Sequence, residues 1–387
     1  MKIQILATDL PRSDGKGYQI VLYWRIRELQ AYGYQVWLHI INYKSHSAFY
    51  DDEIISLIDD GLKIEHSRVS LASIILNVAL MPFKRMPLQN TLFHSLGIKK
   101  LIKRLNRSRG IDITIIYLTR LYWAAGSLKG KVVLEAVDSM ALNFRTRYLT
   151  ESNFFKKCLF FIESYLCLEY EKNIDGCDLV VTVAELDREY FSNVKSINIP
   201  LGVNMTSSGD IVLDGYPRII FSGSMNYQPN RDAINWFLET TWHLIMEKFP
   251  DAKLYIVGRG LSVKEENTES FKGVKFVGEV PSIYDYLTAA DIAVAPMVSG
   301  SGMQFKVLEA MYAGTPVVVS KIGLGSISAV IGRDILVANS PQEFLNSICG
   351  CLDSGEIGRN GMEFVQREHS WRSSGKKFID YISSNNF

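Results

Sequence analysis

The stretch SGMQFKVLEAMYAGTPVVVS, residues 301–320, decides the fold of this chain. Gly302 precedes a helix expected over 304–313, and Gly314 with Pro316 ends that helix before a strand of valines. A helix that leads directly into a buried strand is typical of an α/β domain with a parallel sheet. A helix start reached through a glycine also offers unpaired backbone N–H groups and the positive end of the helix dipole. These features suit a phosphate or a diphosphate.

Two side chains of this helix are candidate ligand-binding groups. Lys306 and Glu309 are three residues apart, so they lie on one face of the helix. Glu309, one turn deeper than the helix start, would reach the hydroxyls of a sugar attached to such a diphosphate. An ordinary buried helix between two strands has the same pattern, so the pattern alone leaves both interpretations open.

The composition is that of a soluble globular protein, with 47% hydrophobic and 21% charged residues. The five cysteines are odd in number and lack CxxC spacing, which indicates neither a disulfide framework nor a zinc site. The N-terminal apolar run is too short for a signal peptide, and the longest apolar segment, 69–81, is too short to cross a bilayer. We therefore expect a cytoplasmic protein.

Short apolar segments alternate with amphipathic segments, which predicts two doubly wound α/β domains. The expected strands are 3–7, 34–41, 113–117, 132–136, 179–183, 218–222, 253–257, 274–277, 292–295, 316–320 and 335–337. The expected helices include 18–32, 153–175, 231–248, 282–289, 304–313 and 341–352. The polar stretch 202–217 separates a first domain, 1–202, from a second, 203–369, and a last helix within 370–387 is a candidate to pack back on the first. Ligands bind at the carboxyl ends of such strands, so we expect the two Rossmann-like domains to face each other across a cleft.

The first turn between a strand and a helix contains Gly15, Lys16 and Gly17. Glycines there let the backbone approach an acceptor sugar or a phosphate closely. The dinucleotide fingerprint GxGxxG needs a third glycine where this chain has Ile20, which argues against a nicotinamide or flavin site. A flexible turn without a ligand is the alternative.

Further polar residues follow other expected strands. Gly223 lies at a turn after 218–222, and Arg259 follows 253–257. Arg259 can bind a diphosphate, or it can be a solvated loop cation. Asp138 follows 132–136 and is placed to contact an acceptor hydroxyl, although a helix cap formed by Asp138 or Ser139 has the same pattern.

Between Glu65 and Asp112 the sequence has nine Lys and Arg and no acidic residue. Apolar residues 69–81 precede a stretch in which basic and apolar residues alternate at helical spacing up to 105. Such a segment can lie in the headgroup layer of an anionic membrane, or it can be a domain helix with a solvated basic face. No aromatic string or basic repeat indicates nucleic-acid binding.

The ordered motifs of the second half resemble the donor domain of the retaining GT-B glycosyltransferases known as family 4. The motifs are the GSM turn, IVGRG, the run from GEV to AVAP, and GMQFKVLEAMYAGTPVVVS, in family order over 218–340. The first half is similar more loosely, through the turn at 15–17, CDLVVTVAELDREYF and NIPLGVN. The phrases SMNYQPN, RMPLQ and GMQFKVLEAM further resemble a bacterial subgroup linked to exopolysaccharide and cell-surface glycan assembly.

This resemblance implies roles for particular residues. Glu309 matches the glutamate that binds the nucleotide ribose, and Ser301 stands where the family has a second glutamate. The glycine-led backbone segment on the diphosphate matches Gly302, Met303 and Gln304. Ser224 and Pro229 stand roughly where family members have an arginine and a lysine. Phosphate neutralisation is then left to three other residues, namely Lys306, Arg259 and Arg231.

The resemblance implies a transferase that moves a sugar from a nucleoside diphosphate sugar to a glycan hydroxyl, with retention and without a metal or other cofactor. Asp138 is expected to orient the acceptor. We expect a lipid-linked acceptor at the inner face of a bacterial cytoplasmic membrane, which residues 69–105 would contact. A non-catalytic nucleotide-sugar-binding subunit and an epimerase of the same fold remain open, and a dehydrogenase fits least.

Overall fold

In the computed structural model the chain folds into two units, each with its own sheet. The first consists of Met1–Leu201 and Ser374–Phe387, and the second of Gly202–Ser373. The structure describes residues 1–13, 15, 17–43, 50–151, 153–260, 271–299, 304–353 and 355–384. Helix α15 (Trp371–Ser383) begins in the second unit and ends in the first.

The first unit is built on a parallel sheet of seven strands in the order β3-β2-β1-β4-β5-β6-β7. The strand order reverses between β1 and β4, and ligands of doubly wound sheets bind at such a point. The strands are β1 (Lys2–Ala7), β2 (Gln35–Asn42), β3 (Lys63–Arg68), β4 (Ile113–Tyr117), β5 (Lys131–Val137), β6 (Leu179–Thr182) and β7 (Ser196–Asn198).

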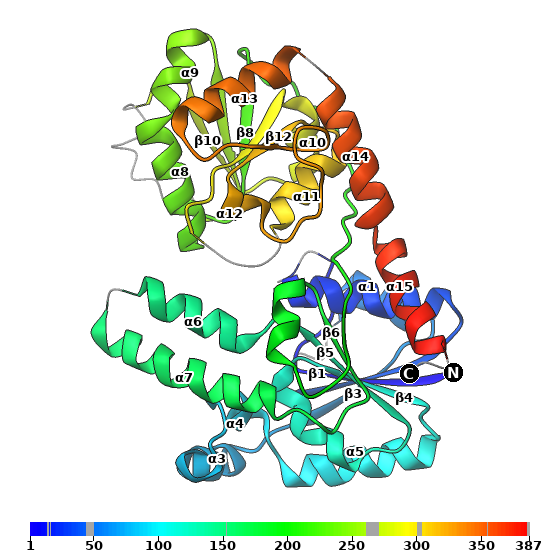
Figure 1. Cartoon of the computed structure of the whole chain (residues 1–387). Coiled ribbons are helices and arrows are strands. Elements are labelled where there is room, and N and C mark those ends of the chain that lie inside the picture. The colour runs from blue at the N-terminus through cyan, green and yellow to red at the C-terminus, as the bar shows by residue number, and fades with distance from the viewer. Residues whose placement is uncertain are drawn as a thin grey trace. The chain divides into compact units, whose positions relative to one another are not determined.

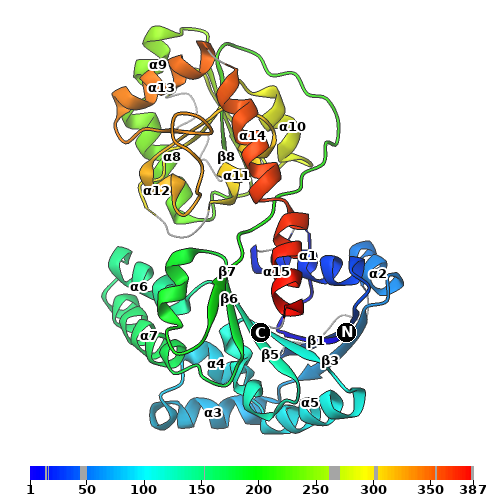
Figure 2. The same ribbon diagram turned by 45° about the vertical axis from the view of Figure 1, so that its right-hand side comes forward.

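Helices cover both faces of this sheet. Figures 1 and 2 show α1 (Gly17–Ala31) and α15 on one face, and α3, α4 and α5 on the other. Strand residues such as Leu6 and Ile116 pack with Phe93 and Ile102 on the second face. The other helices are α2 (Asp52–Asp59), α3 (Leu71–Lys84), α4 (Leu88–Phe93), α5 (Leu96–Arg109), η1 (Thr119–Ser127), α6 (Met140–Thr150), α7 (Phe154–Lys172) and η2 (Glu185–Tyr190).

The second unit contains a parallel sheet of six strands in the order β10-β9-β8-β11-β12-β13, and its order reverses between β8 and β11. The strands are β8 (Arg218–Ser222), β9 (Lys253–Val257), β10 (Val274–Gly278), β11 (Ile292–Ala295), β12 (Val317–Val319) and β13 (Leu336–Val337). The helices are α8 (Gln228–Thr240), α9 (Trp242–Lys248), α10 (Ile283–Ala289), α11 (Phe305–Tyr312), α12 (Lys321–Leu324), α13 (Pro341–Asp353) and α14 (Glu356–Glu368).

Successive residues of β8 enter two separate cores. Phe221 packs with residues of α8, α9 and α13, whereas Ile220 packs with residues of α10, α11 and α14. Strands buried on both faces are apolar throughout, as the valines of β12 are. The expected α/β class with two doubly wound, Rossmann-like domains is confirmed.

The structure differs from the expected elements in two respects. Strands β3 and β7 were not foreseen, because β3 reads KIEHSR and both lie at the edges of the sheet, where polar residues are tolerated. The helix expected over 231–248 is two helices, α8 and α9, which meet at Thr241. The segment 69–105 forms three helices, α3, α4 and α5. No helix in the described ranges has both the length and the apolar character needed to cross a bilayer.

Candidate functional site

The carboxyl end of β8 is a crowded point in the second unit. Gly223 follows this strand with φ of 151°. A Cβ atom there would lie 2.9 Å from Nζ of Lys306 and 2.7 Å from Nδ2 of Asn230. The missing side chain therefore lets the ammonium of Lys306 approach the backbone at the strand end, beside the point where the strand order reverses.

Lys306 lies in the first turn of α11, in surroundings that disfavour its charge. Its ammonium donates a hydrogen bond to Oδ1 of Asn230 and lies 4.4 Å from the centroid of the Phe221 ring. Burial lowers the pKa of Lys306 to about 7, and the nearby Glu309 carboxylate opposes this effect. An anion beside this ammonium would compensate its charge, so the lysine is suited to a phosphate.

Glu309 lies one turn further along α11. Burial raises the pKa of its carboxyl group, and Lys306 counteracts that rise. Its carboxylate makes no hydrogen bond or ion pair with any residue that the structure describes. A carboxylate in this state can accept hydrogen bonds from the hydroxyls of a ligand.

The start of α11 is only partly described. Gln304 precedes the helix and its side chain makes no capping hydrogen bond. Ser301, Gly302 and Met303 lie outside the described residues, and so does Lys16 of the first unit. The expected contact of this backbone segment with a diphosphate therefore stays a prediction.

The other predicted donor residues are placed differently. The side chain of Arg259 is 63% exposed and pairs with the equally exposed Glu279 at 3.7 Å. Arg231 donates hydrogen bonds to the backbone oxygen of Met225 and to Gln228, so it secures its own loop. The backbone oxygen of Ser224 accepts a hydrogen bond of 2.8 Å from Asn230. The structure thus joins Gly223, Lys306 and Asn230 in one cluster. Sequence reasoning assigned no role to Asn230, although this residue ends the phrase SMNYQPN.

In the first unit, strained backbone marks two neighbouring strand ends. Val137, the last residue of β5, has φ of 67°, and Leu118, directly after β4, has φ of 72°. Bulky residues rarely adopt positive φ, and such strain costs about 1–3 kcal/mol per residue, so it persists only where the surroundings enforce it. This strain directly precedes Asp138.

Asp138 is not the cap of the helix that follows it. Ser139 fills that role, because its side chain accepts a hydrogen bond from the backbone N–H of Leu142. The Asp138 carboxylate accepts a hydrogen bond of 2.7 Å from Asn143 instead. Burial raises the pKa of Asp138, while Asn143 and Arg120 oppose the rise.

Two further buried carboxylates support this strand end. Glu171 accepts hydrogen bonds from the Ser139 hydroxyl at 2.7 Å and from the Met140 N–H at 2.8 Å, and Asp187 accepts one of 3.0 Å from the Ser139 N–H. Burial raises the pKa of Glu171 to about 7 and that of Asp187 to about 6. These bonds fix the beginning of α6 relative to Asp138.

The glycine turn of the first unit has polar neighbours that sequence reasoning missed. Gly15 is tightly packed, since a Cβ atom there would lie 3.0 Å from Cβ of Arg12. The Tyr18 hydroxyl donates a hydrogen bond of 3.2 Å to Asp9, and the Arg120 guanidinium lies 5.7 Å from the Tyr18 ring centroid. Tyr18 directly follows Gly17 at the start of α1. Asp9 is a single polar residue in a loop and Arg120 is a single polar residue in the short helix η1, so neither carries a periodic signal.

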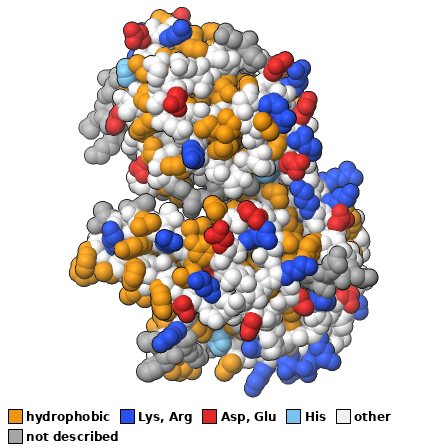
Figure 3. Space-filling view, viewed as in Figure 1, with side chains coloured by type: hydrophobic (Ala, Val, Ile, Leu, Met, Phe, Trp, Pro, Cys, Tyr) orange, Lys and Arg blue, Asp and Glu red, His pale blue; other side chains and the backbone are white. Residues whose placement is uncertain are grey.

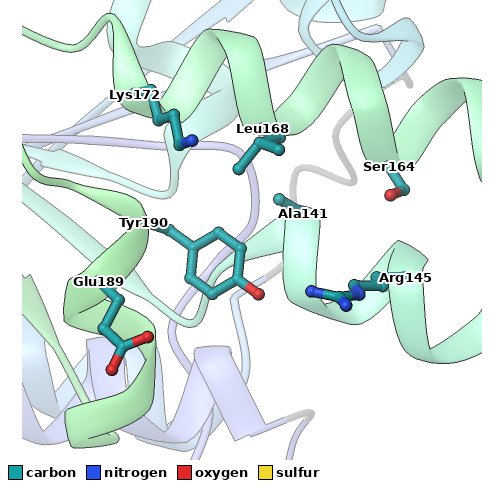
Figure 4. Close-up of a pocket in the computed structure, with 7 residues that line it drawn as sticks. All are labelled: Ala141, Arg145, Ser164, Leu168, Lys172, Glu189 and Tyr190. Carbon is teal, nitrogen blue, oxygen red and sulfur yellow. The ribbon is translucent and has the colours of Figure 1, made fainter.

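A cavity of about 250 Å³ lies between α6, α7 and η2. Figure 4 shows the Lys172 ammonium, the Tyr190 hydroxyl and the Arg145 guanidinium around one space. Two cations and a hydroxyl are suited to a phosphate or a sugar. In the described part of the chain, no group of three or more His, Cys, Asp or Glu is arranged to hold a metal ion.

Comparison with known proteins gives a partial sequence match. The family described as "Glycosyl transferases group 1" matches residues 216–354. A phosphatidyl-myo-inositol mannosyltransferase from Mycobacterium leprae is 35% identical over 139 residues, which is 33% of this chain and 36% of that protein. The chain thus spans about a third of the length of this relative. An uncharacterized 44.6 kDa protein in the cps region of Klebsiella pneumoniae is 23% identical over 99% of this chain and 100% of its own length.

Solved structures match the chain from end to end. HepE from Anabaena, solved in complex with UDP, has a TM-score of 0.65 at 13% identity, over 99% of this chain and 100% of its own. The same protein has been solved with UDP-glucose, with a TM-score of 0.60 at 14% identity over 99% of both chains. At this identity the likeness concerns the fold.

Proposed function

We propose that this chain, which has the GT-B fold and carries a glycosyl transferase group 1 domain at residues 216–354, is a glycosyltransferase that uses a nucleoside diphosphate sugar. The observation that carries the proposal is the cluster of Gly223, Lys306 and Asn230 at the reversal of strand order in the second unit. A half-buried lysine and a half-buried glutamate one turn apart match the charge pattern of a diphosphate joined to a ribose. The complex of HepE with UDP supports a nucleotide ligand for this fold.

In the proposed reaction, the bond between the sugar and the diphosphate breaks and negative charge builds up on the leaving group. Lys306 would stabilise that charge, together with the amides of Gly302, Met303 and Gln304. Because this lysine supplies the positive charge, the reaction is proposed to need no metal. The leaving phosphate would take the proton of the acceptor hydroxyl as the new bond forms on the same face, so the anomeric configuration would be retained. Arg259 and Arg231 would act at the edge of the site.

We propose that the acceptor binds to the first unit near Asp138. The Gly15, Lys16 and Gly17 turn would lie against the same acceptor, and the carboxylate of Asp138 would accept a hydrogen bond from its reacting hydroxyl. The acceptor would be a lipid-linked saccharide of bacterial surface-glycan assembly. Helix α3 supports a membrane location, because Leu71 is 71% exposed and Ile75 is 61% exposed, while α5 presents the basic residues. The protein would then act at the inner face of the cytoplasmic membrane.

Thermal denaturation with a panel of nucleotides and nucleotide sugars tests the donor site. A true donor at 100 times its Kd stabilises the protein by about 2.7 kcal/mol, and the melting temperature rises accordingly. Glu309→Gln is expected to remove most of this shift, because the amide offers one uncharged acceptor oxygen to the ribose hydroxyls in place of two charged ones. The control is Glu363→Gln on α14, which should keep the full shift. A Glu309→Gln protein with wild-type affinity for every nucleotide would show that the site is placed wrongly.

Asp138→Asn tests the acceptor site separately. We expect the variant to lose about 100-fold in kcat for transfer, because the amide orients the hydroxyl less well and does not carry the charge. The nucleotide-induced shift in melting temperature should stay at the wild-type value. Asp210→Asn, in the exposed segment before β8, is the matched control. Equal kcat for Asp138→Asn and wild type would exclude the acceptor role, and donor binding without any turnover in the wild type would favour a non-catalytic subunit.

A further inference from the structure

The α6 and α7 helices expose a group of large apolar side chains. Among them Phe155 is 82% exposed, Phe154 71% and Leu149 66%. Figure 3 shows hydrophobic side chains gathered over these two helices, which are labelled in Figure 1. We define the hairpin surface as Leu149, Phe154, Phe155, Leu159, Ile162 and Tyr165.

Helix α7 places acidic residues on its buried face and apolar residues on its exposed face, which is the opposite of an ordinary surface helix. Its buried face carries Glu163, Cys167 and Glu171, spaced four residues apart, while phenylalanine, leucine and isoleucine face outward. Both buried carboxylates accept hydrogen bonds. Glu163 accepts them from the Leu88 N–H at 3.0 and 3.2 Å, and Glu171 accepts one from the Met140 N–H at the start of α6. The orientation of α7 is therefore set by these bonds. An outward apolar face of this size is unfavourable in water and indicates an apolar surrounding.

The charges beside the hairpin surface indicate which kind of partner would cover its apolar side chains. Arg145, Arg147, Lys156 and Lys157 flank it, and between Arg145 and Tyr165 the only acids are Glu151 and the buried Glu163. Arg147 lies 5.6 Å from the Phe144 ring centroid and Lys157 lies 5.5 Å from that of Tyr148, so these cations lie beside the aromatic residues. A second copy of the chain would bring like charges together. Anionic lipid headgroups would pair with them.

We propose that the hairpin surface inserts into the boundary between headgroups and acyl chains of an anionic lipid bilayer. Phe154 and Phe155 would enter the acyl region, while the flanking cations contact the phosphates of the headgroups. The cavity lined by Arg145 and Lys172 lies between the same two helices, so a phosphate-bearing lipid would meet it near the bilayer. A lipid-linked acceptor near this surface rests on the proposed transferase function. Docking to the bilayer does not need a sugar donor and is measured without one.

Flotation of the full chain with vesicles tests the proposal. Vesicles of phosphatidylcholine with about 30% phosphatidylglycerol should bind the wild type, with much weaker binding to phosphatidylcholine alone. The double variant Phe154→Ser, Phe155→Ser should bind at least tenfold less tightly, because both side chains lose their transfer free energy. The matched control is Val212→Ser, Ile331→Ser, since these residues of the second unit are 95% and 58% exposed. The control should bind like the wild type.

A second probe does not depend on the folding of the serine variant. In Phe155→Trp, tryptophan emission should shift to shorter wavelength on addition of anionic vesicles. No binding of the wild type at low salt, equal binding of Phe154→Ser, Phe155→Ser, or an unshifted Phe155→Trp emission would each overturn the proposal. A dimer that the serine variant dissociates, without vesicle binding, would assign the surface to a second copy and also overturn it. The serine variant should keep its nucleotide-induced thermal shift, so a failure of the transferase function is recognised separately.

Discussion

Replacing Lys306 by methionine is expected to reduce kcat for sugar transfer by about 100- to 1,000-fold, because the leaving diphosphate loses its nearest cation. Methionine keeps the contact with the Phe221 ring, but it removes the cation that counteracts the effect of burial on the Glu309 carboxylate. Thermal denaturation of the unliganded variant therefore checks that a loss in kcat is not a loss of folded protein. Steady-state kinetics with the identified donor measures the loss. Lys248→Met, on the exposed side of α9, is the control, and a Lys306→Met kcat within about twofold of wild type would contradict the assignment.

The pH dependence of donor binding gives an independent test of the same residue. Burial lowers the pKa of Lys306 to about 7, and a diphosphate beside it would raise that value again. Donor binding then takes up a proton. The affinity is therefore full below about pH 7 and falls as the pH rises above it, by up to about tenfold per pH unit. Calorimetric titration between about pH 6 and pH 9 measures this slope, which Lys306→Met should abolish.

Replacing Glu135 by alanine is expected to lower the free energy of unfolding by about 3–5 kcal/mol, because it leaves the charge of Arg25 buried without compensation. Arg25 of α1 donates to both carboxylate oxygens of Glu135 in β5, with distances of 2.7 to 3.1 Å. The two side chains are only 5% and 3% exposed. The Arg25 guanidinium also lies 4.0 Å from the Phe378 ring centroid of α15, so the pair joins three elements of the first unit.

The stabilities of two further variants distinguish the effect of an uncompensated buried charge from the effect of a lost contact. The double variant Arg25→Met, Glu135→Leu removes both charges and should be clearly more stable than Glu135→Ala. Glu185→Ala breaks an exposed pair with Arg188, in which the Glu185 side chain is 66% exposed, and should leave stability almost unchanged. Urea unfolding followed by circular dichroism measures all three. A Glu135→Ala variant as stable as Glu185→Ala would show that the pair is dispensable.

The strands that sequence reasoning located best are those buried on both faces. The expected strands 218–222, 253–257 and 292–295 agree with β8, β9 and β11 to the residue. Their continuous apolar residues stand out between polar turns. Edge strands such as β3 carry no comparable signal, since water takes the place of one neighbour and polar residues are tolerated there.

For the candidate site, sequence reasoning found residues but not their neighbours. Gly223 and Lys306 were each identified from a local pattern, whereas Asn230 and Phe221, which contact Lys306, were not. Their contribution depends on distances across the sheet, and those are not encoded in local spacing. For the same reason the pattern could not distinguish Asp138 from a helix cap, a role that Ser139 takes in the structure.

By itself the sequence determined the α/β class, the alternation of strands and helices and the glycines at strand ends, because burial periodicity and backbone freedom are local properties. Only the tertiary structure decided that Lys306 lies against Gly223 and the Phe221 ring and that Glu135 pairs with Arg25. It also decided that α7 turns its glutamates inward and its phenylalanines outward. These outcomes depend on which distant groups share a low-dielectric space, where hydrogen bonds and charges outweigh the local preference of a side chain.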